Sequence, residues 1–217
     1  MIDNQKDKFV SSLKRYSFGI NPQALSKFDE YSRLIAEANS ALNLLSARDL
    51  RILWERHFLD SVCPLLFGII DKKCSVLDIG SGAGLPGIPL AILSSSINVS
   101  MVESNAKKAR FIERVIKKLD LKNADIENIR IEDFPKKRLF DFCLARAVSK
   151  IKSLLPVMVP HIKSGGSAIF YKGINSETEA ECARELCKSL GFSEPKIVMY
   201  PENITETRFS LVVFVKE

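Results

Sequence analysis

The sequence predicts an α/β protein in which a helical N-terminal extension precedes a mostly parallel, seven-stranded sheet. Apolar residues recur at helical spacing over the first 70 residues. From residue 75 onward, short apolar runs typical of buried strands alternate with amphipathic helical segments. This alternation indicates parallel strands joined by helices that cover both faces of the sheet. We therefore place the extension at 1–70 and the sheet domain at 71–217.

The composition excludes several classes of protein. Of the 217 residues, 46% are hydrophobic and 27% are charged, as in soluble globular proteins. No apolar run approaches the roughly 20 residues that a membrane-spanning helix needs, and the polar start lacks the features of a secretory signal. The five cysteines form no CxxC pair, which favours reduced thiols over a disulfide framework or a zinc cluster. We expect a cytoplasmic protein with no metal site and no membrane contact.

Three helices are predicted in the extension. Gly19 ends the first. Asn21 caps the second, and Pro22 fits the first turn of that helix, where no backbone N–H is needed. A third helix is predicted over 48–67, and Gly68 interrupts the pattern after it.

Seven strands and four helices are predicted in the sheet domain. The strands are expected at 75–80, 98–104, 124–130, 140–146, 167–173, 196–200 and 208–216. The helices are expected at 86–95, 105–119, 151–163 and 176–190, with Gly165 and Gly166 ending the third of them. Because ligands of such sheets bind at the carboxyl ends of the strands, the residues that follow each strand are candidate site residues.

A glycine-rich loop follows the first strand. Gly80, Gly82 and Gly84 lack side chains that would block a ligand's approach to the backbone, although glycines can also serve a tight strand–helix turn. Glu103 ends the second strand, about 20 residues further on, where a carboxylate can accept hydrogen bonds from ribose hydroxyls. Both features suit any adenosine cofactor, whether NAD or S-adenosylmethionine.

Two observations favour S-adenosylmethionine. Asp78 lies two residues before Gly80, and its carboxylate would repel a pyrophosphate but is compatible with a sulfonium and its amino-acid tail. The chain also ends with a seventh strand after a helix–strand unit, which is the order found in class I methyltransferases. The predicted fold is therefore the Rossmann-like fold of class I S-adenosylmethionine-dependent methyltransferases.

Several motifs together resemble the glucose-inhibited division protein B family, also called RsmG. They are Asn43-Leu44, RHFLDS at 56–61, DIGSGAGLPGIPLAI at 78–92, RIEDF at 130–134, FDFCLARA at 140–147 and YKG at 171–173. They follow the family's order and spacing over most of the chain. Leu45 and Ala145 depart from the family pattern, which often has threonine and serine there.

The resemblance implies methyl transfer from S-adenosylmethionine to N7 of a guanine in 16S ribosomal RNA, as free RNA or within a small ribosomal subunit. It implies cofactor contacts at Gly80, Leu85, Ile131, Glu132 and Arg146, with Glu103 on the ribose and Gly82 and Gly84 in the same loop. Arg146 ends the fourth strand and is the candidate catalytic residue. Because guanine N7 has an exposed lone pair and no proton, catalysis can rest on proximity, orientation and electrostatics.

Basic side chains are candidates for RNA contact. They are Arg56 and His57 in the third helix, Lys107, Arg110 and Arg114 on one face of the helix at 105–119, and Lys172 after the fifth strand. The net charge of +6 is compatible with a nucleic-acid partner. A structural role for His57, a solvated outer face for the helix at 105–119 and a solvated Lys172 are alternatives.

Other functions remain open from the sequence. The protein could methylate another RNA, a protein or a small molecule, or it could be a non-catalytic RNA-binding protein that retains the fold. An NAD oxidoreductase is a further alternative, against which Asp78 argues. We expect a monomer.

Overall fold

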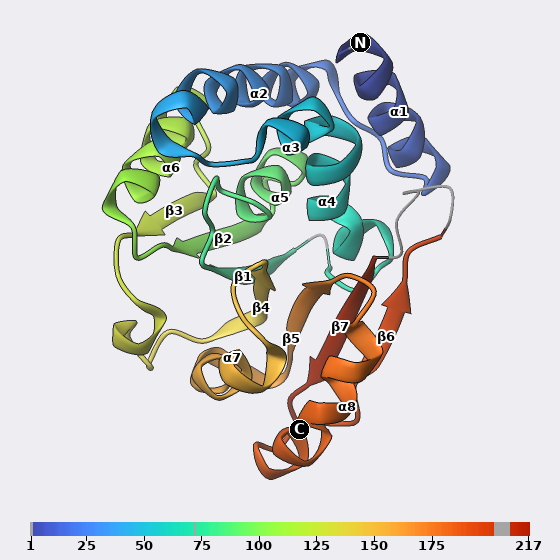
Figure 1. Ribbon diagram of the computed structural model, residues 1–217, viewed down its shortest axis with the longest axis vertical. Helices are drawn as coiled ribbons and strands as arrows, with labels where there is room; N and C mark the ends of the chain where they lie inside the picture. Colours follow the sequence, from blue (N-terminus) through green and yellow to red (C-terminus); the bar gives the residue numbers. More distant parts are fainter. Residues whose placement is uncertain (1, 72, 202–208) are drawn as a thin grey trace.

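The computed structural model describes residues 2–71, 73–201 and 209–217, which form one sheet covered by helices on both faces (Figure 1). The strands are β1 (Cys74–Ile79), β2 (Ile97–Val102), β3 (Ala124–Glu127), β4 (Phe140–Arg146), β5 (Ile162–Lys172), β6 (Lys196–Met199) and β7 (Ser210–Val215). Their order is β3-β2-β1-β4-β5-β7-β6; β7 pairs antiparallel with β5 and β6, and the other pairs are parallel. The predicted mostly parallel, seven-stranded sheet is confirmed.

The helices form two layers. They are α1 (Ile2–Arg15), α2 (Pro22–Leu42), α3 (Ala47–Arg51), α4 (Leu59–Leu66), α5 (Gly87–Leu93), α6 (Ala106–Lys118), α7 (Ile151–Met158) and α8 (Ser176–Ser189), with a π-helix at Leu53–Phe58 and 3-10 turns at Ile131–Asp133 and Val159–His161. Helices α7 and α8 cover one face of the sheet, and α4, α5 and α6 cover the other, with α1 and α2 outside them (Figure 1).

Successive side chains of a strand point to opposite faces of the sheet, so each helix layer packs against its own part of the core. In β1, Val76 packs in the cluster that includes the N-terminal helices, whereas its neighbour Leu77 packs in the cluster beneath α7 and α8. Phe28 and Trp54 from the extension belong to the same cluster as Val76. The expected boundary at 70 and 71 falls between α4 and β1, and the division into an extension and a sheet domain stays a prediction.

Local capping explains two of the predicted helix starts. The Asn21 side chain accepts the N–H of Ala24 at the start of α2, with Pro22 in the first turn, as expected. Asn105 caps α6 in the same way, accepting the N–H groups of Lys107 and Lys108. At the other end of α2, Asn43 adopts φ 47°, a left-handed conformation that asparagine tolerates better than most residues.

The prediction of one helix over 48–67 was wrong. The segment consists of α3, a π-helical stretch and α4, and Ile52 at the first junction has φ −124°. Apolar spacing does not separate a π-turn from an α-turn over such a short run. Ser61 Oγ donates to the His57 carbonyl at 2.6 Å, so a side chain binds a carbonyl that a regular helix would pair with the backbone N–H of residue 61.

The prediction of a helix over 151–163 was also wrong at its end. Helix α7 stops at Met158, and Gly165 and Gly166 lie inside β5 instead of ending a helix. Gly165 has φ +75°, and a Cβ at Gly166 would lie 2.7 Å from the Asp141 carbonyl oxygen. These glycines mark an irregularity in the pairing of β4 with β5, where the register shifts between Phe140 and Phe142.

Strands β3 and β7 are shorter than predicted, and β5 is longer because it begins at Ile162. Strand β3 ends at Glu127, so the expected segment 124–130 is strand only in its first half. Strand β7 begins at Ser210, and residue 208 of the expected strand lies outside the described residues.

The glycine loop has a backbone that requires glycine at more than one position. Gly82 has φ +59° and an added Cβ there would lie at an uncrowded 3.9 Å from the Gly80 carbonyl oxygen, whereas Gly84 has φ +91° and its Cβ would lie 2.7 Å from Ile88 Cγ1. Any other residue at Gly82 or Gly84 would have to adopt an unfavourable left-handed conformation, and at Gly84 its Cβ would also clash with Ile88.

This difference predicts the effect of two matched substitutions. Gly82→Ala should lower the free energy of unfolding by about 1 kcal/mol, because alanine is strained in the left-handed backbone conformation. Gly84→Ala should lower it by about 3 kcal/mol, because overpacking adds to the strain. Urea denaturation of both variants measures the difference, and equal losses would contradict the packing described at Gly84.

Candidate functional site

A pocket of about 600 Å³ lies at the carboxyl ends of β4 and β5, beneath the segment that joins α2 to α4. It is lined by Leu44, Leu45, Ser46, Asp49, Arg56, His57, Asp60, Arg146, Ala147, Val148, Ser149, Tyr171, Lys172, Gly173 and Phe209. The sheet edge and the N-terminal helices therefore contribute about equally to its walls. Four of the predicted site residues meet here: Arg56, His57, Arg146 and Lys172.

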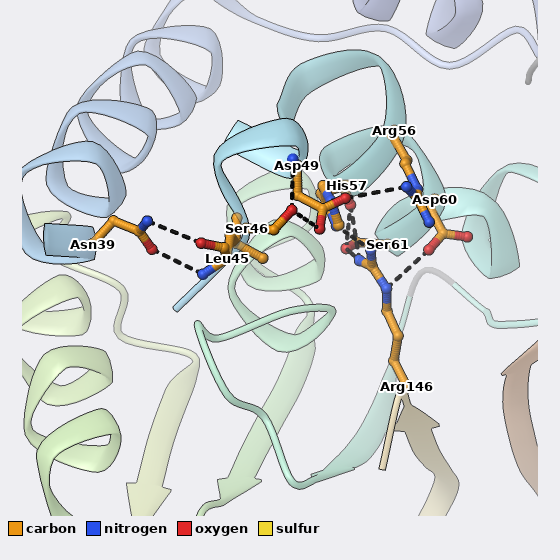
Figure 2. Close-up of polar contacts among 9 residues, drawn as sticks. All are labelled: Asn39, Leu45, Ser46, Asp49, Arg56, His57, Asp60, Ser61 and Arg146. Carbon is orange, nitrogen blue, oxygen red and sulfur yellow. Dashed lines mark hydrogen bonds and ion pairs between the residues drawn. The ribbon is translucent and has the colours of Figure 1, made fainter. Parts of the chain in front are cut away.

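The guanidinium of Arg146 joins the end of β4 to the π-helix and α4 (Figure 2). Its Nε lies 2.9 Å from Asp60 Oδ2, and its Nη1 donates to Ser61 Oγ at 3.0 Å and to the His57 carbonyl at 3.2 Å. Its Nη2 contacts His57 Nδ1. The Arg146 and Asp60 side chains are only 12% and 13% exposed, so water screens this ion pair weakly.

These contacts determine the protonation of His57. Arginine can only donate, so Nδ1 of His57 must be the acceptor and the ring proton lies on Nε2, which faces Asp49 Oδ1 at 3.0 Å. Burial, aided by the nearby charge of Arg146, lowers the pKa of His57 to about 4. His57 is therefore a neutral connector between Asp49 and Arg146 at physiological pH.

Asp49, in α3, is the last member of this network of polar contacts. Its carboxylate accepts hydrogen bonds from Ser46 Oγ at 2.7 Å and Arg56 Nη1 at 3.1 Å, and contacts with Ser46, His57 and Arg56 outweigh burial and lower its pKa. The preceding turn is fixed by Asn39, whose amide side chain both donates to and accepts from the backbone of Leu45 (Figure 2). Arg56 also lies over the ring of Phe209, 5.1 Å from its centroid.

Two tyrosines attach further strands to the same segment. Tyr171, at the end of β5, donates from Oη to the Ser61 carbonyl at 3.0 Å. Tyr200, which follows β6, donates to Asp60 Oδ1 at 2.6 Å. The stretch 57–61 is thus bound by three side chains that follow or end three different strands.

The glycine loop lies beside this pocket. Val148 lines the pocket and also packs on Gly80, where an added Cβ would lie 2.7 Å from Val148 Cγ2. Glu103 is 7% exposed and accepts the N–H of Gly82 at 2.9 Å and that of Asn105 at 2.8 Å. Each carboxylate oxygen keeps a second lone pair for a further donor.

The loop fits a polar ligand. An added Cβ at Gly82 would meet the Gly80 carbonyl oxygen at an uncrowded 3.9 Å, and among the described residues neither the Gly82 carbonyl nor the Ala83 N–H has a hydrogen-bond partner. Beneath the loop, Asp78 is fully buried and accepts the N–H of Gly87 at 3.0 Å, while its Oδ1 has no partner in the described part of the chain. Burial raises the pKa of Asp78 to about 7. Asp78 Oδ1, the Gly82 carbonyl and the Ala83 N–H can therefore each still form a hydrogen bond at this edge of the sheet.

The other predicted cofactor residues gather at the same edge. Leu85 is buried at the end of the loop, and Ile131 is buried in the 3-10 turn beyond β3 while Glu132 beside it is exposed. Asn128 joins this turn to the second strand by donating to the carbonyls of Glu103 and Ser104. Glu103 and the 131–132 turn therefore follow neighbouring strands.

The predicted RNA contacts are separated in space. Lys172 is 14% exposed and binds Glu179 Oε2 and the Ser149 carbonyl, so it holds the loop after β4. Lys107, Arg110 and Arg114 are exposed on α6, outside the residues that line the pocket. Arg114 and Lys117 have partners in Glu37 and Glu113. Because α6 follows β2, Lys107 in its first turn lies nearest the carboxyl edge of the sheet.

Comparison with known proteins identifies the family. The GidB family model, described as rRNA small subunit methyltransferase G, matches residues 24–207. Ribosomal RNA small subunit methyltransferase G of Oenococcus oeni is 33% identical over 93% of this chain and 90% of its own length. The protein of that name from Carboxydothermus hydrogenoformans is 32% identical over 96% and 90%.

The chain belongs to the rRNA small subunit methyltransferase G family. It is therefore an enzyme that transfers a methyl group from S-adenosylmethionine to small-subunit ribosomal RNA, as the motifs predict. This membership excludes the alternatives of an NAD oxidoreductase and of a non-catalytic RNA-binding protein.

Solved structures confirm the class I methyltransferase fold. A ribosomal protein L11 methylase from Lactobacillus delbrueckii superposes with a TM-score of 0.58 at 14% identity, covering 75% of this chain and 80% of that one. M. jannaschii TYW2, solved in complex with AdoMet, gives 0.58 at 19% identity, covering 76% and 77%. At these identities the likeness concerns the fold.

Several pocket residues were not predicted as site residues from the sequence. Asp49, Tyr171 and Phe209 line the pocket but had no role assigned from the sequence, and Tyr200, which binds Asp60, had none either. Tyr171 carried a signal, because it begins the YKG motif at the end of a strand. Asp60 and Ser61 belonged to the RHFLDS motif, and their contacts with Arg146 give that motif its structural meaning.

The described residues include neither a membrane-spanning helix nor a cluster of metal ligands. In the described ranges, no helix combines the length and the apolar character that crossing a bilayer requires. Within the same residues, no cluster of histidine, cysteine, aspartate and glutamate side chains could hold a metal ion.

The depressed pKa of His57 predicts a pH dependence of stability. Between pH 6.5 and about 4 the unfolded chain binds a proton on His57 that the folded protein excludes. The free energy of unfolding should therefore fall as the pH falls through this window, with a contribution from His57 on the order of 3 kcal/mol. Urea titrations of the wild type and His57→Gln from pH 7 to 4 measure it.

The comparison isolates the effect of His57, because His161, whose pKa is also lowered, is present in both proteins. The His57→Gln protein should lose less stability on acidification than the wild type. Identical losses in the two proteins would show that His57 titrates normally.

Proposed function

We propose that the enzyme methylates N7 of a guanine in 16S ribosomal RNA, within the pocket beside Arg146. The observation that carries this proposal is that the pocket's titratable groups are engaged with one another. Arg146 pairs with Asp60, His57 lies between Arg146 and Asp49, and Lys172 pairs with Glu179. Such a pocket can bind and orient a base but, among the residues that the structure describes, offers no free general base, and guanine N7 needs none.

The walls of the pocket also suit a neutral base. The carboxylates of Asp49 and Asp60 are paired with the guanidinium groups of Arg56 and Arg146, so these four side chains carry no net charge. The rings of Tyr171 and Phe209 offer apolar surface for a base.

We propose the following residues for the cofactor. Glu103 would accept hydrogen bonds from the ribose, the Gly80–Leu85 loop would hold the amino-acid part through its backbone, and Ile131 and Glu132 would flank the adenine. S-adenosylmethionine supplies an electrophilic methyl group when bound. Val148, which contacts both Gly80 and the pocket, would mark the boundary between cofactor and base.

Arg146 would act chiefly as a positioning residue. Its contacts with Asp60, Ser61 and His57 hold the π-helix against the end of β4 and so fix the pocket wall. One Nη2 hydrogen has no partner among the described residues, which leaves it available to the reacting groups. Direct catalytic contact by Arg146 stays a prediction.

The wider setting of the reaction is also a proposal. The substrate would be an unpaired segment of 16S ribosomal RNA, free or in an assembling small ribosomal subunit, and the enzyme would act in the cytoplasm as a monomer. Phosphates would be held by Lys107, Arg110 and Arg114 on α6, with Arg56 at the pocket.

The assay for the function uses unmethylated 16S ribosomal RNA and small subunits with radiolabelled S-adenosylmethionine. Nucleoside analysis should give labelled 7-methylguanosine at a single position. Its absence with both substrates, or label on another nucleoside or on protein, would contradict the proposal. Arg146→Gln should reduce the yield at least tenfold, because the pocket wall loses its anchor.

The role of α6 predicts a change in salt dependence. Replacing Lys107, Arg110 and Arg114 with glutamine should weaken RNA binding and reduce the slope of log affinity against log salt concentration by up to about 3. The control replaces three exposed basic residues of α8 and β6, Arg184, Lys188 and Lys196, with the same charge change. Equal slopes in the two triple variants would mean that α6 is only a solvated face.

A further inference from the structure

Tyr31 lies where helix α2 meets the glycine loop, 52 positions earlier in the chain than the residue it binds. Its side chain is fully buried, and its Oη donates to the backbone carbonyl of Ala83 at 2.7 Å. Buried hydroxyls normally find a partner, so the bond alone is ordinary. Its importance comes from the peptide group to which that carbonyl belongs.

This peptide group is held from two directions. Its carbonyl accepts from Tyr31, and its N–H, on Gly84, donates to the Ser81 carbonyl at 2.7 Å. The preceding peptide group, between Gly82 and Ala83, has neither its C=O nor its N–H paired within the described residues. Because the two groups share the Ala83 backbone bonds, fixing one plane limits the directions in which the other can point.

The phenol ring is held as firmly as the hydroxyl. It stacks on Phe58 with 5.3 Å between ring centroids and 15° between planes. Phe58 is itself fully buried and follows His57, the residue that contacts Arg146. On the other side, a Cβ at Gly84 would lie 3.1 Å from Tyr31 Oη, so the loop backbone rests directly on the hydroxyl.

We propose that Tyr31 is a positioning residue for S-adenosylmethionine, whose hydroxyl orients the Ala83–Gly84 peptide so that the free backbone groups of Gly82 and Ala83 face the cofactor. This inference rests on the proposed cofactor site at the glycine loop. It gives the N-terminal extension a part in cofactor binding in addition to its part in the pocket wall.

The test compares two variants that each lose a hydrogen bond from a buried hydroxyl. Tyr31→Phe removes the bond to Ala83, and Ser100→Ala removes the bond that Ser100 Oγ donates to Asp125 Oδ2, outside the pocket and the glycine loop. Calorimetric titration with S-adenosylhomocysteine should show about tenfold weaker binding for Tyr31→Phe, which corresponds to about 1.4 kcal/mol. Ser100→Ala should stay within about twofold of the wild type, although both variants lose a hydrogen bond from a buried hydroxyl.

Amide hydrogen exchange supplies a measurement that does not depend on activity. In Tyr31→Phe, exchange should accelerate at residues 82–85 and stay unchanged in β4 and β5. Faster exchange throughout the sheet, or equal loss of affinity in both variants, would mean that Tyr31 only stabilises the fold. Wild-type affinity in Tyr31→Phe, with the wild type binding S-adenosylhomocysteine, would overturn the inference while leaving the cofactor site in place; a wild type that binds none would remove that site.

A second variant decides the matter if Tyr31→Phe does not fold. Phe58→Leu keeps the hydroxyl but removes the ring on which Tyr31 stacks. It should give faster exchange at 82–85 and an affinity between those of the wild type and a tenfold loss. Unchanged exchange and unchanged affinity in Phe58→Leu would contradict the positioning role.

Discussion

The ion pair between Arg146 and Asp60 is the interaction on which the site depends. It joins the end of a central strand to a helix that precedes the sheet in the chain, and both side chains are nearly buried. A buried pair of this kind adds little stability over apolar residues, but the loss of one partner leaves an uncompensated charge. The surrounding bonds to His57, Ser61 and Tyr200 satisfy most of the remaining polar groups, so the pair is part of a continuous network.

This network explains why the N-terminal helices belong to the functional site. Sheet-domain residues alone would leave one wall of the pocket open, because Leu44, Asp49 and His57 come from the extension. The π-helical stretch presents the His57 carbonyl to Arg146, and the first turn of α4 presents the Ser61 side chain. π-turns occur frequently at functional sites. The same helices reach the glycine loop through Tyr31. The extension therefore contacts both the glycine loop and the pocket beside Arg146.

Local patterns in the sequence were sufficient for the fold and for part of the site. The alternation of strands and helices, the glycine loop and Glu103 each depend on residues close in sequence, so spacing alone located them. The joining of Tyr200 to Asp60 could not be read in this way, because 140 positions separate them. The π-helix was missed because its apolar spacing resembles that of an α-helix, and Gly165 and Gly166 were misassigned because a strand irregularity and a helix end use the same residue. Asp49 lies in the first turn of α3, where acidic residues are common, so nothing local in the sequence marked its contact with His57.

The most direct measurement of the central interaction is a double-mutant cycle on stability. Arg146→Gln, Asp60→Asn and the double variant would be compared with the wild type by urea denaturation. Each single substitution should cost several kcal/mol, and the double should cost less than their sum by about 2 kcal/mol or more, because removing both partners leaves no unpaired charge. Losses that add to within about 0.5 kcal/mol would show that Arg146 and Asp60 act independently, and would contradict the account of how the extension is joined to the sheet.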